Sequence, residues 1–310
     1  MHYVVTGGAG FIGSNIVREL AGHCSVTIFD NLSNGNFKCI NSYLEEKNVK
    51  FIRGDIRNLD ELKKTFKSAD GVFHGAAQIS VQDSIENPIC TDEINTRGTL
   101  NVLKAAVDCD VKKVVFASSA AVYGDNPVLP KKEDLLPSPM SPYAVSKLTG
   151  EYYCSVFSEI YGLETACLRY FNVFGPGQDP NSPYAAVIPK FINAIIKGNS
   201  PVIYGDGNQT RDFIYVRDVA QANIIAMNSS ASGIFNIASS QSLSLNQLLE
   251  ILKEIAQSPV EPVFEAGKVG DIRHSVADIS KAKETFNFSP LYSLKEGLIE
   301  TYLSFINELE

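Results

Sequence analysis

The sequence predicts an α/β protein with a doubly wound, parallel sheet of about seven strands and a smaller C-terminal lobe interleaved with it. Short β-branched and aromatic runs alternate with helical stretches through the first half of the chain, which is the pattern of a parallel sheet flanked by helices. The first of these runs leads directly into a glycine-rich turn, Gly7 to Gly13. After Asn172, glycines and prolines interrupt the alternation, so we expect the second lobe to begin there.

Hydrophobic periodicity places the individual elements of this fold. Strands are expected at six places in the first half of the chain, residues 2–6, 26–29, 49–53, 71–74, 113–117 and 164–169. Helices are expected where apolar residues recur every three or four positions, at 11–21, 59–66, 92–108 and 143–161. The second half should contain an apolar helix at 185–198, a buried strand at 233–238, and helices at 245–257 and 293–308.

The strand at 233–238 would return to the sheet, so the two lobes are expected to be interleaved rather than sequential. The first domain would hold residues 1–172 and about 213–240. The second lobe would hold residues from about 173 to 212 and from 241 to 310.

The composition is that of a folded globular protein. Of 310 residues, 45% are hydrophobic and 20% are charged, and the formal net charge is −8. This acidic balance, without a dense Lys/Arg stripe, argues against a nucleic-acid surface, which needs clustered positive charge. No apolar run is long enough to span a bilayer, and the N-terminus shows no signal-peptide pattern. We therefore expect a cytoplasmic protein that binds neither nucleic acid nor membrane.

Six cysteines are widely spaced along the chain, with neither a C-x-x-C pair nor interleaved histidines. This spacing predicts no metal site and no disulfide framework. Reduced, buried thiols are the expected state of cysteines in a cytoplasmic protein.

The glycine-rich turn has the surroundings of a dinucleotide site. It reads G-x-x-G-x-x-G at Gly7, Gly10 and Gly13, with a strand before it and a helix after it. In such a turn of a Rossmann fold the backbone approaches a pyrophosphate, which lies on the helix N-terminus. Asp30 closes the second strand, where a carboxylate can bind the adenosine ribose. Asp30 would repel a 2′-phosphate, and Asn31 to Gly35 contains no arginine, so the sequence predicts NAD rather than NADP.

A second pattern supplies candidate catalytic residues. Tyr143 and Lys147 are four positions apart near the start of a predicted helix, so they lie on one face of it. A phenol with an ordinary pKa of about 10 is a poor base, but a neighbouring ammonium and a cationic nicotinamide stabilise the phenolate. Ser119, just after the strand 113–117, is the expected third member. Its hydroxyl would hydrogen-bond the reacting oxygen and help to pass a proton to or from Tyr143.

With these motifs the sequence closely resembles the UDP-glucose 4-epimerase family, in the extended branch of the short-chain dehydrogenase/reductase superfamily, over nearly its whole length. The glycine spacing is typical of that superfamily. The matching strings are Thr6 to Gly13, Asp30 to Gly35, Gly54 to Arg57, His74 to Gln78, Ser118 to Gly124, Tyr143 to Lys147, Arg169 to Asn172 and Arg211 to Phe213.

The resemblance implies a set of cofactor contacts along the edge of the sheet. These are Gly7, Gly10, Phe11, Ile12, Gly13, Asp30, Asn31, Asn34, Gly35, Asp55, Ile56, Ala76, Ala77, Gln78, Asn95, Ser118, Tyr143, Lys147 and Tyr170. Asp55 and Ile56 would border the adenine, and Tyr170 would lie near the nicotinamide. Ile56 would equally suit sheet packing, whereas a carboxylate at the end of a strand needs a polar partner.

The reaction that the resemblance implies is 4-epimerisation of a UDP-hexose. Tyr143 would take the proton of the sugar 4-hydroxyl while hydride leaves C4 for NAD⁺, which gives a 4-keto sugar. This sugar would turn about its diphosphate link, and the same cofactor would return the hydride to the opposite face. NAD would then be recycled without net redox change.

Other reactions on the same fold remain as alternatives. Sugar-nucleotide 4,6-dehydratases and UDP-glucuronate decarboxylases resemble this chain but carry acidic residues near the positions of Ala120 and Ala121, because elimination needs an acid and a base. A UDP-glucuronate-type epimerase would share fold and cofactor. A nucleotide-sensing regulator without chemistry would keep the fold, but such proteins tend to lose the tyrosine or the lysine.

The UDP-sugar is expected on the second lobe, because a diphosphate needs positive charge that the sheet side hardly offers. The expected substrate contacts are Ser80, Ser119, Asn172, Val187, Tyr204, Arg211, Lys268, Asp271 and Ser275. By resemblance Arg211 would meet phosphate and Asp271 the uridine ribose, although Arg211 would also suit an ion pair with Asp212 or Asp218. Lys268 stands where the family usually has arginine, and it lacks the bidentate fork of that residue.

Ser275 bears on the choice of sugar. Family members restricted to UDP-glucose and UDP-galactose have a tyrosine at the matching place, and a serine leaves volume in the sugar pocket. The segment Tyr184 to Pro189 resembles UDP-N-acetylglucosamine 4-epimerases. Together these features predict that N-acetylated UDP-hexoses are accepted as well.

Relatives commonly form homodimers through two helices of each subunit. The candidate segments here are 92–108 and 143–161, whose outer apolar residues would equally suit a core. A homodimer is the expected assembly.

Overall fold

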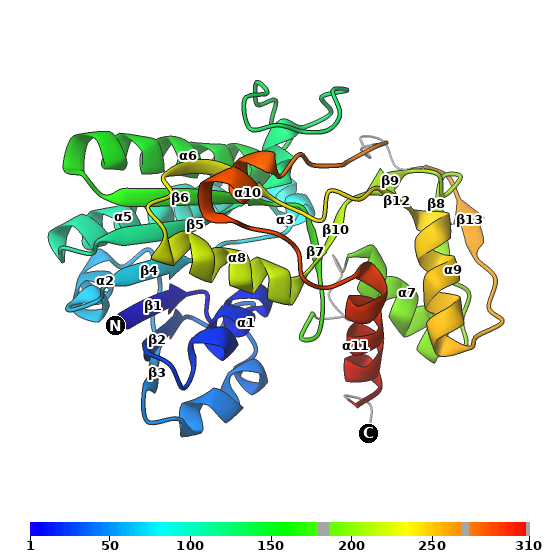
Figure 1. Ribbon diagram of the computed structural model, residues 1–310, viewed down its shortest axis with the longest axis horizontal. Coiled ribbons are helices and arrows are strands. Elements are labelled where there is room, and N and C mark those ends of the chain that lie inside the picture. The colour runs from blue at the N-terminus through cyan, green and yellow to red at the C-terminus, as the bar shows by residue number, and fades with distance from the viewer. Residues whose placement is uncertain (179–185, 268–272, 308–310) are drawn as a thin grey trace.

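A seven-stranded parallel sheet forms the centre of the computed structural model, which describes residues 1–178, 186–267 and 273–307 (Figure 1). The strand order is β11-β6-β5-β4-β1-β2-β3. The strands are β1 (His2–Thr6), β2 (Ser25–Asp30), β3 (Val49–Arg53), β4 (Gly71–His74), β5 (Lys113–Ser119), β6 (Glu164–Tyr170) and β11 (Gly233–Ile237). Chain order reverses between β1 and β4, and ligands bind at such a point in open sheets. The predicted doubly wound sheet is confirmed, including the late return of the chain as β11.

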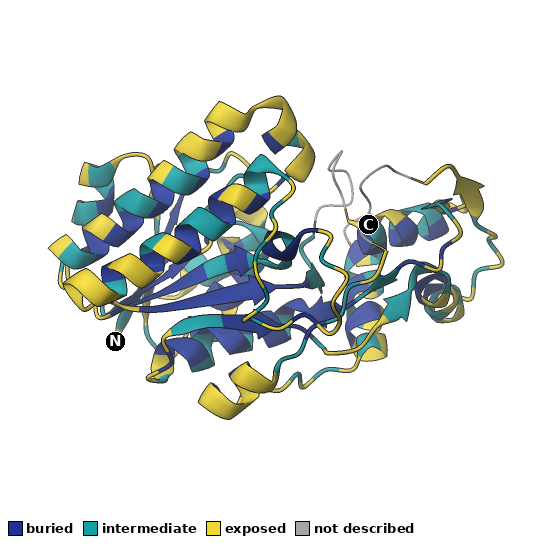
Figure 2. Cartoon of the chain, turned by 90° about the horizontal axis from the view of Figure 1, so that it is seen from above, coloured by how far each residue is buried: buried dark blue, intermediate teal, exposed yellow. Residues whose placement is uncertain are grey.

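Helices cover both faces of this sheet. On one face α1 (Phe11–Leu20) packs against α8 (Val216–Asn228), and on the other lie α2 (Leu59–Phe66), α5 (Gly98–Asp108) and α6 (Pro142–Tyr161). Neighbouring strand residues alternate between the two cores: Val114 packs with α2, α5 and α6, and Val115 packs with α1 and α8. Both faces of a parallel sheet are therefore buried, and Figure 2 shows the strands enclosed between the helical layers.

A third apolar cluster holds the smaller lobe together, on the right of Figure 1. It joins α7 (Val187–Ile196), α9 (Leu245–Ala256) and α11 (Leu294–Asn307). Three short strand pairs complete this part of the chain: β7 (Asn172–Phe174) with β10 (Phe213–Tyr215), β9 (Thr210–Arg211) with β12 (Leu243–Ser244), and β8 (Val202–Tyr204) with β13 (Val263–Glu265). The remaining short helices are α3 (Val81–Glu86), α4 (Pro88–Thr91) and α10 (Ser280–Phe286).

The described helices differ from the prediction in two ways: one predicted helix begins irregularly, and α3, α4, α8 and α10 were not predicted. The expected helix 92–108 starts with a π-helical turn, Asp92–Arg97, before α5 begins. Such turns are frequent at functional sites. Hydrophobic periodicity also missed α8, since several of its buried positions are alanines, which contribute little to an apolar pattern.

The six cysteines all lie in the described ranges and none is in a disulfide. The expectation that they are buried is wrong for most of them. Only Cys154 and Cys167 are buried, and Cys90 is exposed because it belongs to the short surface helix α4. Within the described ranges, none of the helices combines the length and the apolar character needed to cross a membrane.

Candidate active site

The glycine-rich turn connects β1 to α1 and lies against the loop that follows β4. Gly7 has a left-handed backbone (φ +71°), and a Cβ there would lie 2.6 Å from the Ala76 nitrogen. A Cβ at Gly13 would lie 2.1 Å from the Gly7 carbonyl oxygen. Only glycine fits at either position. Gly10 caps α1 without a side chain, which leaves the amide groups of the first helical turn to a ligand such as a phosphate.

Asp30, the last residue of β2, faces this turn. Its carboxylate accepts hydrogen bonds from the Ala9 amide at 3.0 Å and the Leu32 amide at 2.8 Å. A carboxylate has roughly four acceptor positions, so two remain for the hydroxyls of a ribose. A Cβ at Gly35 would lie 3.0 Å from Asp30 Oδ1, which shows how closely the following loop packs here. The cradle of small residues and the partly engaged carboxylate fit NAD.

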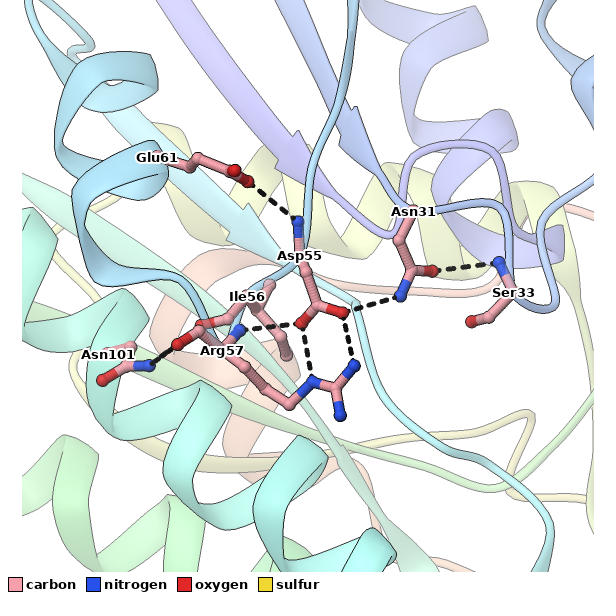
Figure 3. Close-up of polar contacts among 7 residues, drawn as sticks. All are labelled: Asn31, Ser33, Asp55, Ile56, Arg57, Glu61 and Asn101. Carbon is pink, nitrogen blue, oxygen red and sulfur yellow. Dashed lines mark hydrogen bonds and ion pairs between the residues drawn. The ribbon is translucent and has the colours of Figure 1, made fainter.

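Figure 3 shows the surroundings of Asp55, which follows β3. Its carboxylate accepts three hydrogen bonds from Arg57, from the main-chain amide, Nε and Nη2, at 2.9, 3.0 and 2.7 Å, and one from Asn31 Nδ2 at 3.1 Å. The side-chain hydrogen bonds of Arg57 are the main reason that the pKa of Asp55 falls to about 2. Asn101 fixes the same loop by donating to the carbonyls of Ile56 and Arg57. The sequence predicts a polar partner for Asp55, but the role of Arg57 was missed.

Ser119, Tyr143 and Lys147 come together where β5 ends. Ser141 caps α6, so Tyr143 and Lys147 occupy its first two turns. Ser119 and Tyr143 lie close enough for the Ser119 hydroxyl to lower the pKa of the Tyr143 phenol. Lys147 Nζ donates to the Ala117 carbonyl at 2.8 Å and lies 5.8 Å from the centre of the Tyr143 ring. The arrangement provides a proton-transfer pair with a cation beside it.

Burial dominates the electrostatics of this group. It raises the pKa of the Tyr143 phenol, against the smaller opposing effect of the Ser119 hydrogen bond. It lowers the pKa of Lys147 from 10.5 to about 8. The neighbouring His74 stays neutral, because burial and the charge of Lys147 lower its pKa to about 3. The protein alone therefore keeps the phenol protonated near neutral pH, and a cationic nicotinamide would shift it toward the phenolate.

Two residues predicted to contact the cofactor have their hydroxyl groups bound within the protein. Ser118 Oγ donates to Glu151 Oε1 at 2.5 Å, and Tyr170 Oη donates to Asn223 Oδ1 of α8 at 2.9 Å. Both side chains are buried. Their contacts with NAD stay predictions, and their hydroxyls serve the packing of β5 and β6.

The loop after β4 is joined to the π-helical turn and to α6 by one side chain. Asn95 Oδ1 accepts the Gln78 amide at 2.7 Å, and Asn95 Nδ2 donates to the Gln78 carbonyl at 2.9 Å and to Ser146 Oγ at 3.0 Å. Ala76 and Ala77 are half-buried in the same loop. Asn95 therefore fixes the predicted cofactor channel against the helix that carries Tyr143.

The predicted substrate contacts lie in two places. Ser80 caps α3 on the sheet side. Ser119 ends β5 on the same side. Four others are at ends of elements of the smaller lobe or its connections: Asn172 begins β7, Val187 begins α7, Tyr204 ends β8 and Arg211 ends β9. Ser275 lies beside Arg211, because its amide donates to the Thr210 carbonyl at 3.1 Å. Lys268, Asp271, Tyr184 and Ala185 lie outside the described residues.

Asp212 connects the sheet side to the smaller lobe. Its buried carboxylate accepts hydrogen bonds from the amide and hydroxyl of Ser239, at 2.9 and 2.7 Å, and from the Ala277 amide at 3.1 Å. Its carbonyl accepts the amide and the side chain of Asn172, both at 3.1 Å. Sequence reasoning treated Asp212 only as a possible partner of Arg211 and missed this role, which needs contacts between distant segments.

The sequence and the fold are both similar to those of known proteins. Residues 3–238 match the NAD dependent epimerase/dehydratase family. The structure is similar to that of a UDP-N-acetylglucosamine 4-epimerase from Methanobrevibacter ruminantium, solved with UDP-N-acetylmuramic acid (46% identity, TM-score 0.96, 99% of this chain and 98% of that chain). It is similar to a UDP-glucose 4-epimerase from Thermotoga maritima, solved with UDP-glucose (38% identity, TM-score 0.95, 100% of both chains). A UDP-glucuronate 4-epimerase from Thermodesulfobacterium geofontis is 35% identical over 97% of this chain and 94% of its own length.

Proposed function

Because the chain belongs to the NAD-dependent epimerase/dehydratase family, we propose that it is a 4-epimerase that interconverts UDP-hexoses. Its cofactor is NAD, in agreement with the prediction from Asp30. The observation that carries the proposal is the proximity of Ser119 to Tyr143 beside Lys147, at the same edge of the parallel sheet where β1 leads into the glycine-rich turn.

Each member of this group has one task in the proposed reaction. Bound NAD supplies the acceptor and the donor of the hydride. Tyr143 takes the proton of the sugar 4-hydroxyl and later returns it, and Ser119 hydrogen-bonds the reacting oxygen. Lys147 is held against the Ala117 carbonyl, where its charge favours the phenolate of Tyr143. Between the two proton transfers the 4-keto sugar rotates about its diphosphate link and presents its opposite face to the cofactor.

The residues after Ser119 favour epimerisation over elimination. Ala120 and Ala121 begin a 3-10 turn, and the Ala121 amide donates to Ser119 Oγ at 3.1 Å. Neither side chain can act as the acid or base that a dehydratase needs. The intact group of Ser119, Tyr143 and Lys147 also argues against a regulator that only senses the nucleotide.

We place NAD on residues 1–172 and about 213–240, and the UDP-sugar on the lobe formed by about 173–212 and 241–310, although α10 within the last range packs against β11 of the sheet. Asn172, Val187, Tyr204 and Arg211 support the second half of this proposal, since all four lie at ends of elements in or beside that lobe. Lys268 and Asp271 would complete the nucleotide site. A diphosphate there would meet the guanidinium of Arg211.

The choice of sugar rests on Ser275. It lies beside the strand of Arg211, where a small side chain leaves room for an N-acetyl group. The UDP-N-acetylglucosamine 4-epimerase similarity supports the same reading. We therefore propose that the enzyme accepts UDP-N-acetylglucosamine and UDP-N-acetylgalactosamine as well as UDP-glucose and UDP-galactose.

The test is an epimerisation assay of the purified protein without added NAD, with both substrate pairs and with UDP-glucuronate. We expect turnover of both pairs. Lasting accumulation of reduced cofactor, or turnover of UDP-glucuronate alone, would contradict the proposal. Turnover confined to UDP-glucose and UDP-galactose would refute only its N-acetyl part. Ser275→Tyr should then suppress N-acetyl turnover and spare the plain sugars, with Ser275→Ala as the control.

A homodimer is proposed for the assembly. An apolar stripe at helical spacing, formed by Val145, Tyr152, Val156 and Ile160, lies on the outer side of α6, and Tyr152 and Ile160 are 58% and 67% exposed. A continuous stripe of this kind favours an interface. The outer side of α5 carries Lys104 instead, so α6 is the better supported of the two predicted helices. The cytoplasmic location stays a prediction.

A further inference from the structure

A buried ion pair lies directly behind the proposed catalytic group, and no step of the reaction uses it. Ser118 of β5 pairs in register with Arg169 of β6, and the next residues along, Ser119 and Tyr170, pair likewise. Side chains of residues that face each other on neighbouring strands point to the same side of a sheet. Ser118 and Arg169 therefore both meet Glu151, which stands four positions after Lys147 on α6.

The carboxylate of Glu151 is fully buried and accepts three hydrogen bonds. Oε1 accepts hydrogen bonds from Ser118 Oγ at 2.5 Å and Arg169 Nε at 2.8 Å, and Oε2 accepts Arg169 Nη2 at 2.7 Å. The two charged side chains are 0% and 2% exposed. The guanidinium also lies 4.7 Å from the centre of the Tyr123 ring, whose hydroxyl donates to Asn236 of β11 at 2.7 Å.

Stability alone does not account for such a pair. Taking two charges out of water costs about as much as their attraction returns, so buried ion pairs often contribute little net free energy. What this one does provide is geometry. It forms a planar, bidentate contact of fixed orientation between α6, β5 and β6.

The fixed contact bears on the relative position of Ser119 and Tyr143. Two successive residues of β5 are bound to α6: the Ala117 carbonyl by Lys147 Nζ at 2.8 Å, and the Ser118 hydroxyl by Glu151. Ser119 is the next residue of the strand, and Tyr143 is one turn before Lys147 on the helix. The same two hydrogen bonds, from Lys147 to the Ala117 carbonyl and from Ser118 to Glu151, therefore fix the strand end that carries Ser119 against the helix that carries Tyr143.

We propose that Glu151 and Arg169 are positioning residues of the reaction, which act through Ser118 to hold Ser119 in hydrogen-bonding reach of Tyr143. The proposal rests on the proposed function for its kinetic consequence, but its structural consequence stands alone. A displacement of about 1 Å at a reacting group can cost about a hundredfold in rate, and so a modest release of α6 from β5 would be visible in kcat.

The experiment compares Ser118→Ala, Glu151→Gln and Arg169→Met with Lys113→Met. Lys113 is a matched control, since it is a buried cation at the opposite end of β5, where its Nζ donates to the Ser229 carbonyl at 2.6 Å and lies 3.7 Å from Glu164. Each variant is measured for bound NAD, Tm, kcat and KM. Ser118→Ala removes one bond and keeps the ion pair, so it serves where the charge variants fail to fold.

We expect the three variants near the site to lose about 10- to 100-fold in kcat per NAD-loaded enzyme, with KM within about threefold of the parent. Lys113→Met should leave kcat unchanged within about twofold, whatever its effect on Tm. Equal kcat in Ser118→Ala and the parent would overturn the proposal. If the parent turns over no UDP-hexose, crystal structures of the parent and Ser118→Ala decide instead: a longer distance between Ser119 Oγ and the Tyr143 hydroxyl in the variant supports the proposal, and an equal distance overturns it.

Discussion

Replacing Lys147 by methionine should make the protein more stable and inactive at once. Burial lowers the pKa of this ammonium from 10.5 to about 8, and at about 1.4 kcal/mol per pH unit the charged form costs the folded state about 3 kcal/mol at neutral pH. Methionine removes that cost. It also leaves the Ala117 carbonyl without the Nζ donor, a loss of about 1–2 kcal/mol. The net gain is about 1–2 kcal/mol, or a rise in Tm of about 2–3 °C for a chain of 310 residues.

The stability difference between Lys147→Met and the parent should depend on pH. Because the folded pKa lies below the unfolded one, the penalty is fully present below pH 8 and disappears as pH rises from about 8 to 10.5. The stability advantage of Lys147→Met should therefore shrink between pH 7.5 and about 9.5. Unfolding is followed by calorimetry on nucleotide-free protein, since bound NAD would stabilise the two proteins unequally. A variant that is less stable than the parent, with a parallel pH profile, would refute the reasoning.

Three further predictions concern the cofactor, the chemistry and the assembly. Tyr143→Phe should lower kcat by about a thousandfold while the purified protein keeps its NAD, because the phenol is the proton carrier; an active variant would remove Tyr143 from the reaction. Gly13→Ala should lose bound NAD and lower Tm, since its Cβ would meet the Gly7 carbonyl oxygen at 2.1 Å, and normal nucleotide content would speak against the cradle. Val156→Glu should halve the mass measured by light scattering if α6 forms the dimer interface, whereas an unchanged mass would place the interface elsewhere.

The parts of the site that sequence reasoning located are those with a local pattern. The glycine-rich turn is a continuous string, and Tyr143 and Lys147 are one helical turn apart, so spacing alone brings them together. The bond between Ser118 and Glu151, and the pairing of Ser118 with Arg169, depend on the register of β5 against β6. Register is decided by packing of segments far apart in the chain, and no local pattern reports it.

A similar reason explains the positions that were missed elsewhere. The sequence shows Arg57 as part of a motif, but its side-chain hydrogen bonds to the Asp55 carboxylate depend on the conformation of the loop after β3. Asn95, within the irregular start Asp92–Arg97, bonds to Gln78 of the loop after β4 and to Ser146 of α6, both far from it in the sequence. Periodicity predicts a helix there and cannot show that its first turn is widened.

The buried carboxylate of Asp212 sets a limit on how the molecule can move. Its carboxylate binds the segments at Ser239 and Ala277, and its carbonyl binds Asn172, so four passages of the chain between sheet and lobe meet there, its own included. Separating the lobes would take the hydrogen-bond donors at Ser239 and Ala277 away from the buried Asp212 carboxylate, which is costly in free energy. We therefore expect the two lobes to move little relative to each other. In the proposed reaction it is then the sugar that rotates, inside a rigid active site.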